Sequence, residues 1–583
     1  MRIRMVSLED GITACGFRKM AAFVSRLNAD TDVYYVTTTH QYKGILNAIM
    51  GSRGSGGDLS DDQVDEVAQG LLGSDLIGFS SMTGYADLTK RIAHRVRELD
   101  PSIYMLWGGI HPIIHPEDAI TGEIDAICTG EGEVAFEQLF DALQAGRDVT
   151  GVKNFWFKQG EEVKRNHLLP LMSSEEMETL PFAQYWEREK IYRPGKGFDD
   201  VSLGDYVCND GLSYTAIWSI GCPFHCTYCG NTKFIANDLK YKRIRHPSAR
   251  YMVDQIKDVR RRFPHISHVN FQDDSFMAIP YPQLEEFAEL WKAELDLPFA
   301  VYGVIPNYVK QDKFEILTWA GMNRIRMGIQ SGSEHILEFY KRPSPPAKIR
   351  AAAEVIGSFA GEYHLPPLYD IIVDNPVETR QDVRDTLELL YEMPRPFNLL
   401  ILSLKVIPNT DLEQALKDRG IDLEQIGAGY LVIPPRAANL LLYLLNVVKP
   451  PRWLWNLLLR RVRASTEPQP LYPRLGLALR TAHLSKRALG HARRMDFSIT
   501  PGWIGYWFWR AGLVGLFWRR LHPRLAKPAR PAKWASTPPS RRPSASVLPV
   551  TPAPAAASAP VANASAFAGE AAPAAVVAPT AER

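Results

Sequence analysis

The stretch that decides the fold of this 583-residue chain is IGCPFHCTYCGN, residues 220–231, which contains three of the six cysteines. Cys222, Cys226 and Cys229 follow the spacing C-x-x-x-C-x-x-C. Three thiolates on one short loop can bind three irons of a 4Fe–4S cluster, and the fourth iron is then open to a small molecule. An open coordination position is typical of a catalytic metal site rather than a closed structural one.

A zinc knuckle is the alternative, with His225 or the distant Cys208 as the fourth ligand. Zinc sites usually present their ligands as two separated pairs, and this sequence has no second C-x-x-C. The loop follows the apolar run Thr215–Ile220, so we expect it at the exit of a buried strand. These observations favour the cluster, with Tyr228 beside whatever the open iron binds.

The loop resembles the cluster loop of the radical S-adenosylmethionine (SAM) enzymes. The resemblance implies that the open iron chelates SAM and that the reduced cluster cleaves it to methionine and a 5′-deoxyadenosyl radical. Strands and helices alternate in six units over residues 206–435, which matches the partial (β/α)6 barrel of that family. The strands are predicted at Thr215–Ile220, His268–Phe271, Phe299–Gly303, Arg324–Ile329, Leu368–Val373 and Leu399–Val406.

Polar segments follow these predicted strands, at the rim where barrel chemistry collects. The segment Gln330–Glu334 resembles the family's G-x-E/Q-S-G-S stretch. Pro408 lies in a turn that resembles the family's P-G-T turn. The G-G-E motif that is usual in the family is absent. Loop chemistry and helix capping are the alternative for each segment alone. The resemblance implies SAM contacts at Tyr228, Asp273, Asp274, Gln330, Ser331, Glu334, Asn375 and Pro408, and no catalytic residue is assigned.

Residues 1–150 alternate short strands with amphipathic helices, which indicates a doubly wound parallel sheet of flavodoxin-like type. Ligands of such sheets lie beyond the carboxyl ends of the strands, where residues 80–83, 108–112 and 129–133 follow. Paired glycines there let the backbone approach a flat ligand closely. The strands are predicted at Ile3–Ser7, Val33–Thr37, Leu76–Ser80, Ile103–Trp107 and Asp125–Cys128.

The segments WGGIHP and CTGEGE resemble the cobalamin-binding domain that precedes many radical SAM domains. The motif D-x-H-x-x-G, which supplies an axial histidine in other cobalamin proteins, is absent, so the resemblance implies a base-off cobalamin. His111 is interpreted either as an axial ligand or as a turn residue before Pro112. The resemblance implies cobalamin contacts at Ser80, Ser81, Thr83, Gly108, Gly109, His111, Gly130, Glu131 and Gly132.

The rest of the chain divides by composition. Residues 151–205 are predicted as a connector with one β-hairpin around Gln159-Gly160 and an irregular part from Glu175 to Tyr206. Residues 531–583 are rich in proline and alanine and are expected to be disordered.

Residues 436–530 are predicted as a basic helical module. The whole chain has a net charge of +2, but residues 1–435 contain 45 Lys and Arg against 61 acids, whereas residues 436–545 contain 21 against two. The module contains two apolar runs, residues 439–448 and 502–518. Neither is a good membrane span, because the first is too short and the second contains Arg510 near its middle. Its tryptophans either lie in the interface of an anionic membrane or cap the barrel. No nucleic-acid-binding fold motif is recognised, so no nucleic-acid partner is expected.

The two resemblances together imply a cobalamin-dependent radical SAM enzyme, similar to the class B methyltransferases. We expect methyl transfer to an unactivated carbon of an apolar, lipid- or isoprenoid-like substrate, with a reductant such as flavodoxin or ferredoxin. The alternatives are a radical cyclisation or rearrangement, and a non-catalytic, membrane-tethered cobalamin or iron–sulfur sensor. Free thiols and the absence of a signal-peptide pattern predict a cytoplasmic protein, peripheral on the inner face of the membrane if the basic module binds lipid.

Overall fold

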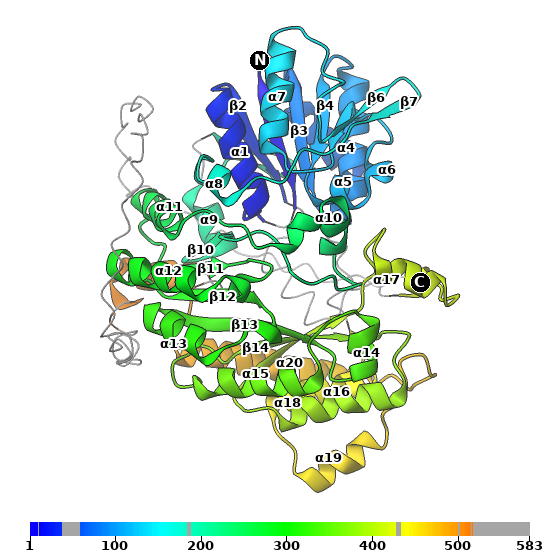
Figure 1. Cartoon of the computed structure of the whole chain (residues 1–583), viewed down its shortest axis with the longest axis vertical. Helices are drawn as coiled ribbons and strands as arrows, with labels where there is room; N and C mark the ends of the chain where they lie inside the picture. The colour runs from blue at the N-terminus through cyan, green and yellow to red at the C-terminus, as the bar shows by residue number, and fades with distance from the viewer. Residues whose placement is uncertain are drawn as a thin grey trace, which may run out of the picture. The chain divides into compact units, whose positions relative to one another are not determined.

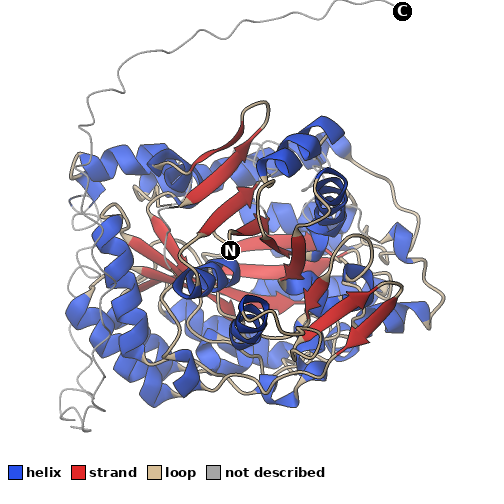
Figure 2. Ribbon diagram, turned by 90° about the horizontal axis from the view of Figure 1, so that it is seen from above, coloured by secondary structure: helices blue, strands red, loops and turns tan. Residues whose placement is uncertain are grey.

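A computed structural model of the chain describes residues 1–9, 11–37, 59–183, 188–426, 433–498, 502–514 and 516. Two β-sheets with their helices and a set of C-terminal helices make up this part (Figures 1 and 2). The predicted disordered segment, residues 531–583, lies outside the described residues, as do Phe517 and Trp518.

The first sheet has nine strands in the order β7-β6-β5-β4-β3-β1-β2-β8-β9. The adjacent strands β5, β4, β3, β1, β2 and β8 run parallel to one another. At one edge the hairpin β6–β7 pairs antiparallel with β5, and at the other edge β9 pairs antiparallel with β8. The strands are β1 (Ile3–Leu8), β2 (Thr31–Val36), β3 (Leu76–Ser81), β4 (Tyr104–Gly108), β5 (Ala126–Cys128), β6 (Phe155–Gln159), β7 (Glu162–Arg165), β8 (Glu189–Arg193) and β9 (Gly197–Asp200).

Helices cover both faces of this sheet, because its central strands are apolar on both sides. One pair, α3 and α4, packs with Val67 and Ile92 into the core that Phe79 and Trp107 share. The other pair, α1 and α7, packs together with buried Phe17 and Phe136. This is the doubly wound arrangement that the sequence predicts. The helices are α1 (Cys15–Leu27), α3 (Asp61–Gly70), α4 (Ala86–Leu99), α5 (Ile110–Ile114), α6 (Pro116–Ala119), α7 (Glu133–Gln144), α8 (Ser174–Met177) and α9 (Leu203–Asp210).

The prediction of an irregular part from Glu175 to Tyr206 was wrong. This part forms the hairpin β8–β9, and β8 joins the first sheet beside β2. The ion pair of Glu189 with Arg18, and its hydrogen bond from Tyr35, hold β8 in the sheet at 3.4 Å and 2.9 Å. A buried glutamate in a short strand breaks the apolar alternation on which strand prediction depends.

The second sheet is the predicted six-stranded parallel array, in the sequential order β10 to β15. Its strands are β10 (Ser213–Ala216), β11 (His268–Phe271), β12 (Phe299–Val304), β13 (Met322–Gln330), β14 (Leu368–Val373) and β15 (Asn398–Ser403). The helices between them are α10 (Asn231–Asn237), α11 (Ala249–Arg262), α12 (Tyr281–Glu294), α13 (Gln311–Ala320), α14 (Glu334–Phe339), α15 (Pro346–Ser358), α16 (Arg380–Glu392) and α17 (Asp411–Lys417).

The first barrel strand differs from the prediction of Thr215–Ile220, since β10 already ends at Ala216. The backbone N–H groups of Trp218 and Ser219 donate to the carboxylate of Asp273 instead of to a strand. Ile220 then pairs antiparallel with Arg245 in an isolated bridge. The chain therefore leaves the sheet before the cysteine loop begins.

The basic module consists of α18 (Ala437–Val447), α19 (Arg452–Leu459), α20 (Pro473–Arg493) and α21 (Gly502–Arg510). Helix α18 packs against α16 and α20, with Leu442 and Leu445 buried. Helix α21 packs against α9, where the Trp503 ring N–H donates to Cys208 Sγ at 3.1 Å. Cys208 is therefore engaged with the C-terminal helices.

Candidate active site

A cavity of about 410 Å³ lies at the carboxyl ends of the parallel strands in the first sheet. Its lining is mainly apolar, with Phe17, Leu106 and Phe136 among the walls. Two residues of the barrel part, Ile217 and Phe234, complete it. These two residues flank the cysteine loop in the sequence, so the cavity adjoins both parts of the described chain.

The predicted cobalamin contacts divide into two groups. Ser80, Gly108, Gly109, Gly130 and Gly132 line the cavity. The remaining four, Ser81, Thr83, His111 and Glu131, lie outside this lining. Their roles stay predictions.

The four differ in what holds them. Ser81 is fully buried and accepts a hydrogen bond from the Trp107 ring N–H at 3.0 Å. Thr83 begins a short 3-10 turn, and Glu131 forms an ion pair with Arg245 at 2.8 Å.

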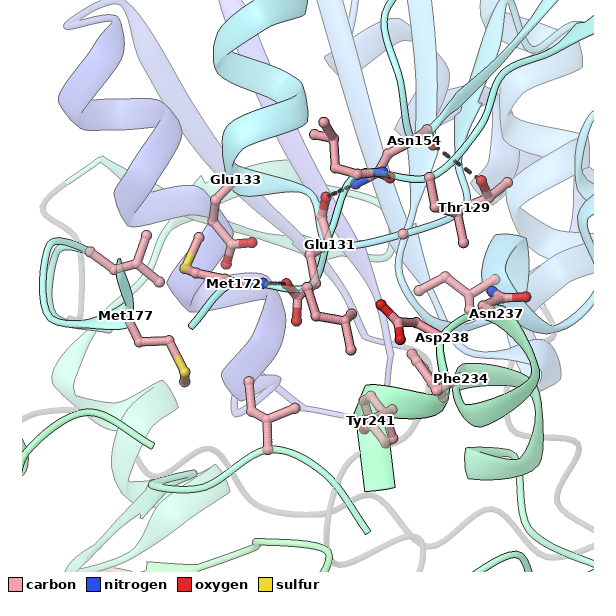
Figure 3. A pocket seen from close by; sticks show the side chains of 17 residues that line it. Thr129, Glu131, Glu133, Asn154, Met172, Met177, Phe234, Asn237, Asp238 and Tyr241 are labelled. Carbon is pink, nitrogen blue, oxygen red and sulfur yellow. Dashed lines mark hydrogen bonds between the residues drawn. The ribbon is translucent and has the colours of Figure 1, made fainter. Parts of the chain in front are cut away.

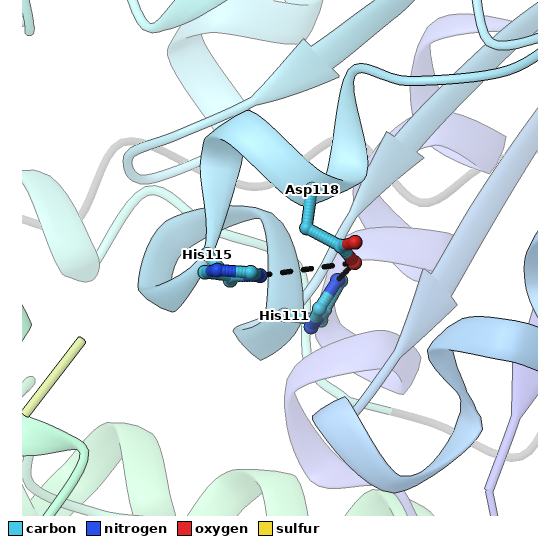
Figure 4. A group of neighbouring side chains, drawn as sticks. All are labelled: His111, His115 and Asp118. Carbon is cyan, nitrogen blue, oxygen red and sulfur yellow. Dashed lines mark hydrogen bonds and ion pairs between the residues drawn. The ribbon is translucent and has the colours of Figure 1, made fainter. Parts of the chain in front are cut away.

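His111 belongs to a group of three potential metal ligands with His115 and Asp118, whose ligand atoms lie within 4.8 Å of one another (Figure 4). Asp118 already pairs with Lys90 at 2.6 Å and with His111 Nε2 at 2.9 Å. The pKa of His111 is lowered, mainly because the side chain is buried. The His111 ring stacks on the Trp107 ring, and the two ring centroids are 5.0 Å apart. The ion pairs of Asp118 with Lys90 and His111 hold this group together in the structure.

The three cysteines of the loop follow β10, after the chain has left the second sheet. Cys222 and Cys226 are buried, and the other cysteine thiols are among the groups that raise the pKa of Cys229. Burial is the main cause and raises that pKa to about 12, so the thiol is protonated until a metal binds it. The Ser275 hydroxyl donates to Cys222 Sγ at 3.4 Å.

The zinc alternative needs His225 or Cys208 as a fourth ligand. His225 pairs with Asp411 at 3.3 Å, and Cys208 is engaged with Trp503. Each proposed fourth zinc ligand therefore already has another partner in this structure.

Arg342 is a site residue that sequence reasoning missed. Its guanidinium is buried and donates to Cys226 Sγ at 3.8 Å and to the Tyr228 hydroxyl at 3.0 Å. Its Nε atom is buried and has no hydrogen-bond partner among the described residues. A buried cation beside thiols, with a spare donor, suits an anionic ligand at this loop. No local motif marks Arg342, which follows α14 in sequence.

Three of the predicted SAM contacts are turned inward. Asp273 accepts from Ser219 Oγ at 2.6 Å, and burial raises the pKa of Asp273 to about 7. Ser331 is fully buried and bonded to Thr386 at 3.1 Å. Asn375 is fully buried and donates to the Tyr340 hydroxyl at 3.0 Å. In this structure these side chains support the rim loops, and their contact with SAM stays a prediction.

The other predicted contacts, Tyr228, Asp274, Gln330, Glu334 and Pro408, are exposed or partly exposed. Three non-glycine residues at or beyond the ends of β13, β14 and β15 have left-handed backbones: Gln330 at φ 72°, Asp374 at φ 61° and Asn409 at φ 58°. Such conformations cost free energy and concentrate at functional sites. The barrel rim around the cysteine loop therefore has the backbone signature of a ligand site.

Figure 3 shows a second cavity, of about 220 Å³. It adjoins the first and shares Ile113, Gly130, Glu133 and Phe234 with it. Glu131 from the first sheet and Tyr241 from the barrel part face it from opposite sides. Burial raises the pKa of Glu133, which lines both cavities. The apolar members of the lining are Ile113, Leu168, Leu169, Leu171, Met172, Met177, Leu180, Ile220 and Phe234.

Comparison with known proteins accounts for both parts of the site. Residues 217–390 match the family described as the radical SAM superfamily, and residues 48–140 match the B12-binding domain. The chain is a cobalamin-binding radical SAM enzyme. Its cofactors are a 4Fe–4S cluster, SAM and cobalamin. The prediction of a non-catalytic sensor is thereby set aside.

This radical SAM enzyme is similar to an uncharacterized methyltransferase of Pyrococcus horikoshii, at 23% identity over 54% of this chain and 63% of the relative. It is also similar to the anaerobic magnesium-protoporphyrin IX monomethyl ester cyclase of Synechocystis, at 26% identity over 67% of this chain and 75% of the relative. The chain thus spans less than two thirds of the first of these relatives.

A solved structure of the cobalamin-dependent SAM radical enzyme OxsB has the same fold, with a TM-score of 0.53 at 15% identity over 90% of this chain and 81% of that one. Within the described residues, the structure contains no helix of the length and apolarity that a membrane crossing requires.

Proposed function

We propose that this enzyme transfers a methyl group to an unactivated carbon of an apolar, lipid- or isoprenoid-like substrate. The observation that carries the proposal is the shared wall between the two sites. Ile217 and Phe234, on either side of the cysteine loop, complete the cavity of the B12-binding domain. The side chain of Asn409 donates to the backbone of Ile114 in α5, which brings the barrel rim against the same cavity.

The apolar lining of the smaller cavity supports an apolar substrate. The smaller cavity adjoins the larger one, and Ile220 at the start of the cysteine loop lines it. A substrate there can be close to the corrin and to SAM, which shortens both transfers.

The protein's own groups hold and shield the reacting partners. Arg342 and Ser275 donate to the sulfurs of Cys226 and Cys222, and the buried carboxyl group of Asp273 fixes the chain that enters the loop. When bound, the cluster and SAM supply a 5′-deoxyadenosyl radical and methylcobalamin supplies the methyl group. We further propose a flavodoxin- or ferredoxin-type reductant and a cytoplasmic location, peripheral on an anionic membrane.

The test is turnover by anaerobically reconstituted protein with SAM and dithionite. Native protein should contain about four irons per chain and form 5′-deoxyadenosine. The Cys222→Ala, Cys226→Ala, Cys229→Ala triple variant should lose both, while Cys208→Ala, a cysteine outside the loop, should keep both. Deoxyadenosine formation by the triple variant would overturn the assignment of the loop.

Methyl transfer and substrate class need a second measurement. S-Adenosylhomocysteine should accumulate with deoxyadenosine, because donation of the SAM methyl group leaves it behind. With trideuteromethyl SAM and a lipid extract, the label should enter the organic phase. Deoxyadenosine without S-adenosylhomocysteine would instead support a cyclisation or rearrangement, the second candidate, which the likeness to the cyclase favours. Label that remains only in polar products would contradict the apolar substrate.

A further inference from the structure

Exposed large apolar side chains gather in the C-terminal helices. Among the described residues, 20 such side chains are exposed, and 12 of them lie between Val448 and Leu516. Trp453 is 70% exposed and Leu457 is 50% exposed. Contiguous exposed apolar groups on a folded protein mark a surface for a partner or a membrane.

Helix α19 carries apolar residues on two opposite faces. Trp455 and Leu459 are buried, and the Trp455 ring stacks on Tyr391 of α16 with centroids 5.1 Å apart. Trp453 and Leu457, one turn apart, are exposed on the other face. Helix α19 lies outside α16 and α18 in Figure 1. Packing against the barrel therefore explains the apolar residues of its inner face only.

Basic residues surround the exposed apolar pair. We define the α19 face as Val448, Lys449, Arg452, Trp453, Leu457 and Arg460, all of which are exposed. Arg452 also pairs with Glu388 at 2.7 Å, which fixes the start of the helix.

Acidic residues are scarce in this part of the sequence. Over residues 436–516 the sequence contains only two acids, Glu467 and Asp496, against 13 Lys and Arg. Asp496 is buried in an ion pair with Arg324, so it does not neutralise the surface. An acidic or anionic partner is therefore favoured over a neutral one.

We propose that the α19 face docks the enzyme on the surface of an anionic lipid bilayer. Trp453 and Leu457 enter the headgroup region, and Lys449 and Arg460, which flank the helix, contact lipid phosphates. Trp455 and the Arg452–Glu388 pair hold the helix on the barrel, so that docking orients the whole enzyme. This inference does not depend on methyl transfer.

The test is co-sedimentation of full-length protein with vesicles of phosphatidylcholine, alone or mixed with phosphatidylglycerol. The unmodified protein should pellet with the mixed vesicles, and less so as salt rises. Trp453→Ser with Leu457→Ser should weaken binding about tenfold, and Arg460→Gln about fivefold. Leu239→Ser is the matched control, since Leu239 is 71% exposed but lies outside the module, and it should bind as the unmodified protein does.

Two outcomes would overturn the proposal. The first is equal binding by the Trp453→Ser, Leu457→Ser variant and the Leu239→Ser control. The second is a dimer in solution that this double variant dissociates, because the face would then join two copies of the chain. Circular dichroism and iron content confirm that each variant is folded, and deoxyadenosine formation by the same preparations reports separately on the proposed function.

Discussion

At the scale of single residues, Arg342 determines the electrostatics of the cysteine loop. Its guanidinium lies 3.8 Å from Cys226 Sγ, and a unit charge at that distance is worth about 4 kcal/mol at an effective dielectric constant of about 20. Arg342→Met should therefore lower the reduction potential of the cluster by on the order of 100 mV and slow deoxyadenosine formation. Mediated redox titration followed by electron paramagnetic resonance measures the potential. Arg342→Lys, which keeps the charge, should recover part of it, and an unchanged potential in Arg342→Met would assign the residue a packing role.

At the scale of the secondary-structure elements, β4 ends at Gly108 and is followed by Gly109, and the two glycines have different surroundings. Gly109 has φ 89°, and a Cβ there would lie 2.9 Å from the Ser81 backbone nitrogen, so any side chain at this position disturbs the protein itself. Gly108 also lines the larger cavity, and its Cβ would meet nothing closer than 3.8 Å. Gly108→Phe should therefore fill the cavity and abolish cobalamin binding, whereas Gly108→Ala should keep about one cobalamin per chain with a base-off absorption spectrum. Spectrophotometry of protein from a cobalamin-supplemented host measures both, and tight binding by Gly108→Phe would place the cofactor elsewhere.

At the scale of the whole molecule, the C-terminal helices pack against histidines of the barrel part that are buried. The His265 ring packs edge-on against Tyr506 and Trp509 of α21, and burial lowers its pKa to about 4. Between pH 6.5 and pH 4 the unfolded chain therefore binds a proton at His265 that the folded protein does not bind. The free energy of unfolding falls as the pH falls through this range, by about 2 kcal/mol at pH 5. Asp273 and Glu378, whose pKa values are raised to about 7 and 8 by burial, act in the opposite sense in every variant. His265→Phe should thus lose less melting temperature than the unmodified protein between pH 7 and pH 5, and equal losses would show that His265 does not titrate in this way.

The sequence by itself determined the features that local patterns encode. Strand–helix alternation reports which side chains are buried, and it located both sheets and the glycine-rich strand ends of the larger cavity. The cysteine spacing predicted the cluster loop, because the chemistry of three thiolates depends on little beyond their separation along one loop. The charge count marked the basic module. In each case the information lies within a few tens of residues.

Only the tertiary structure decided what depends on contacts between distant segments. It brought Arg342 to Cys226, directed Asp273, Ser331 and Asn375 inward, and added β8 to the first sheet. It also separated two tryptophans two residues apart, since Trp455 is buried on Tyr391 while Trp453 is exposed. Polar side chains at strand ends read alike in sequence whether they bind a ligand or support a loop. Their hydrogen-bond partners, which only the closed barrel brings near, decide between the two.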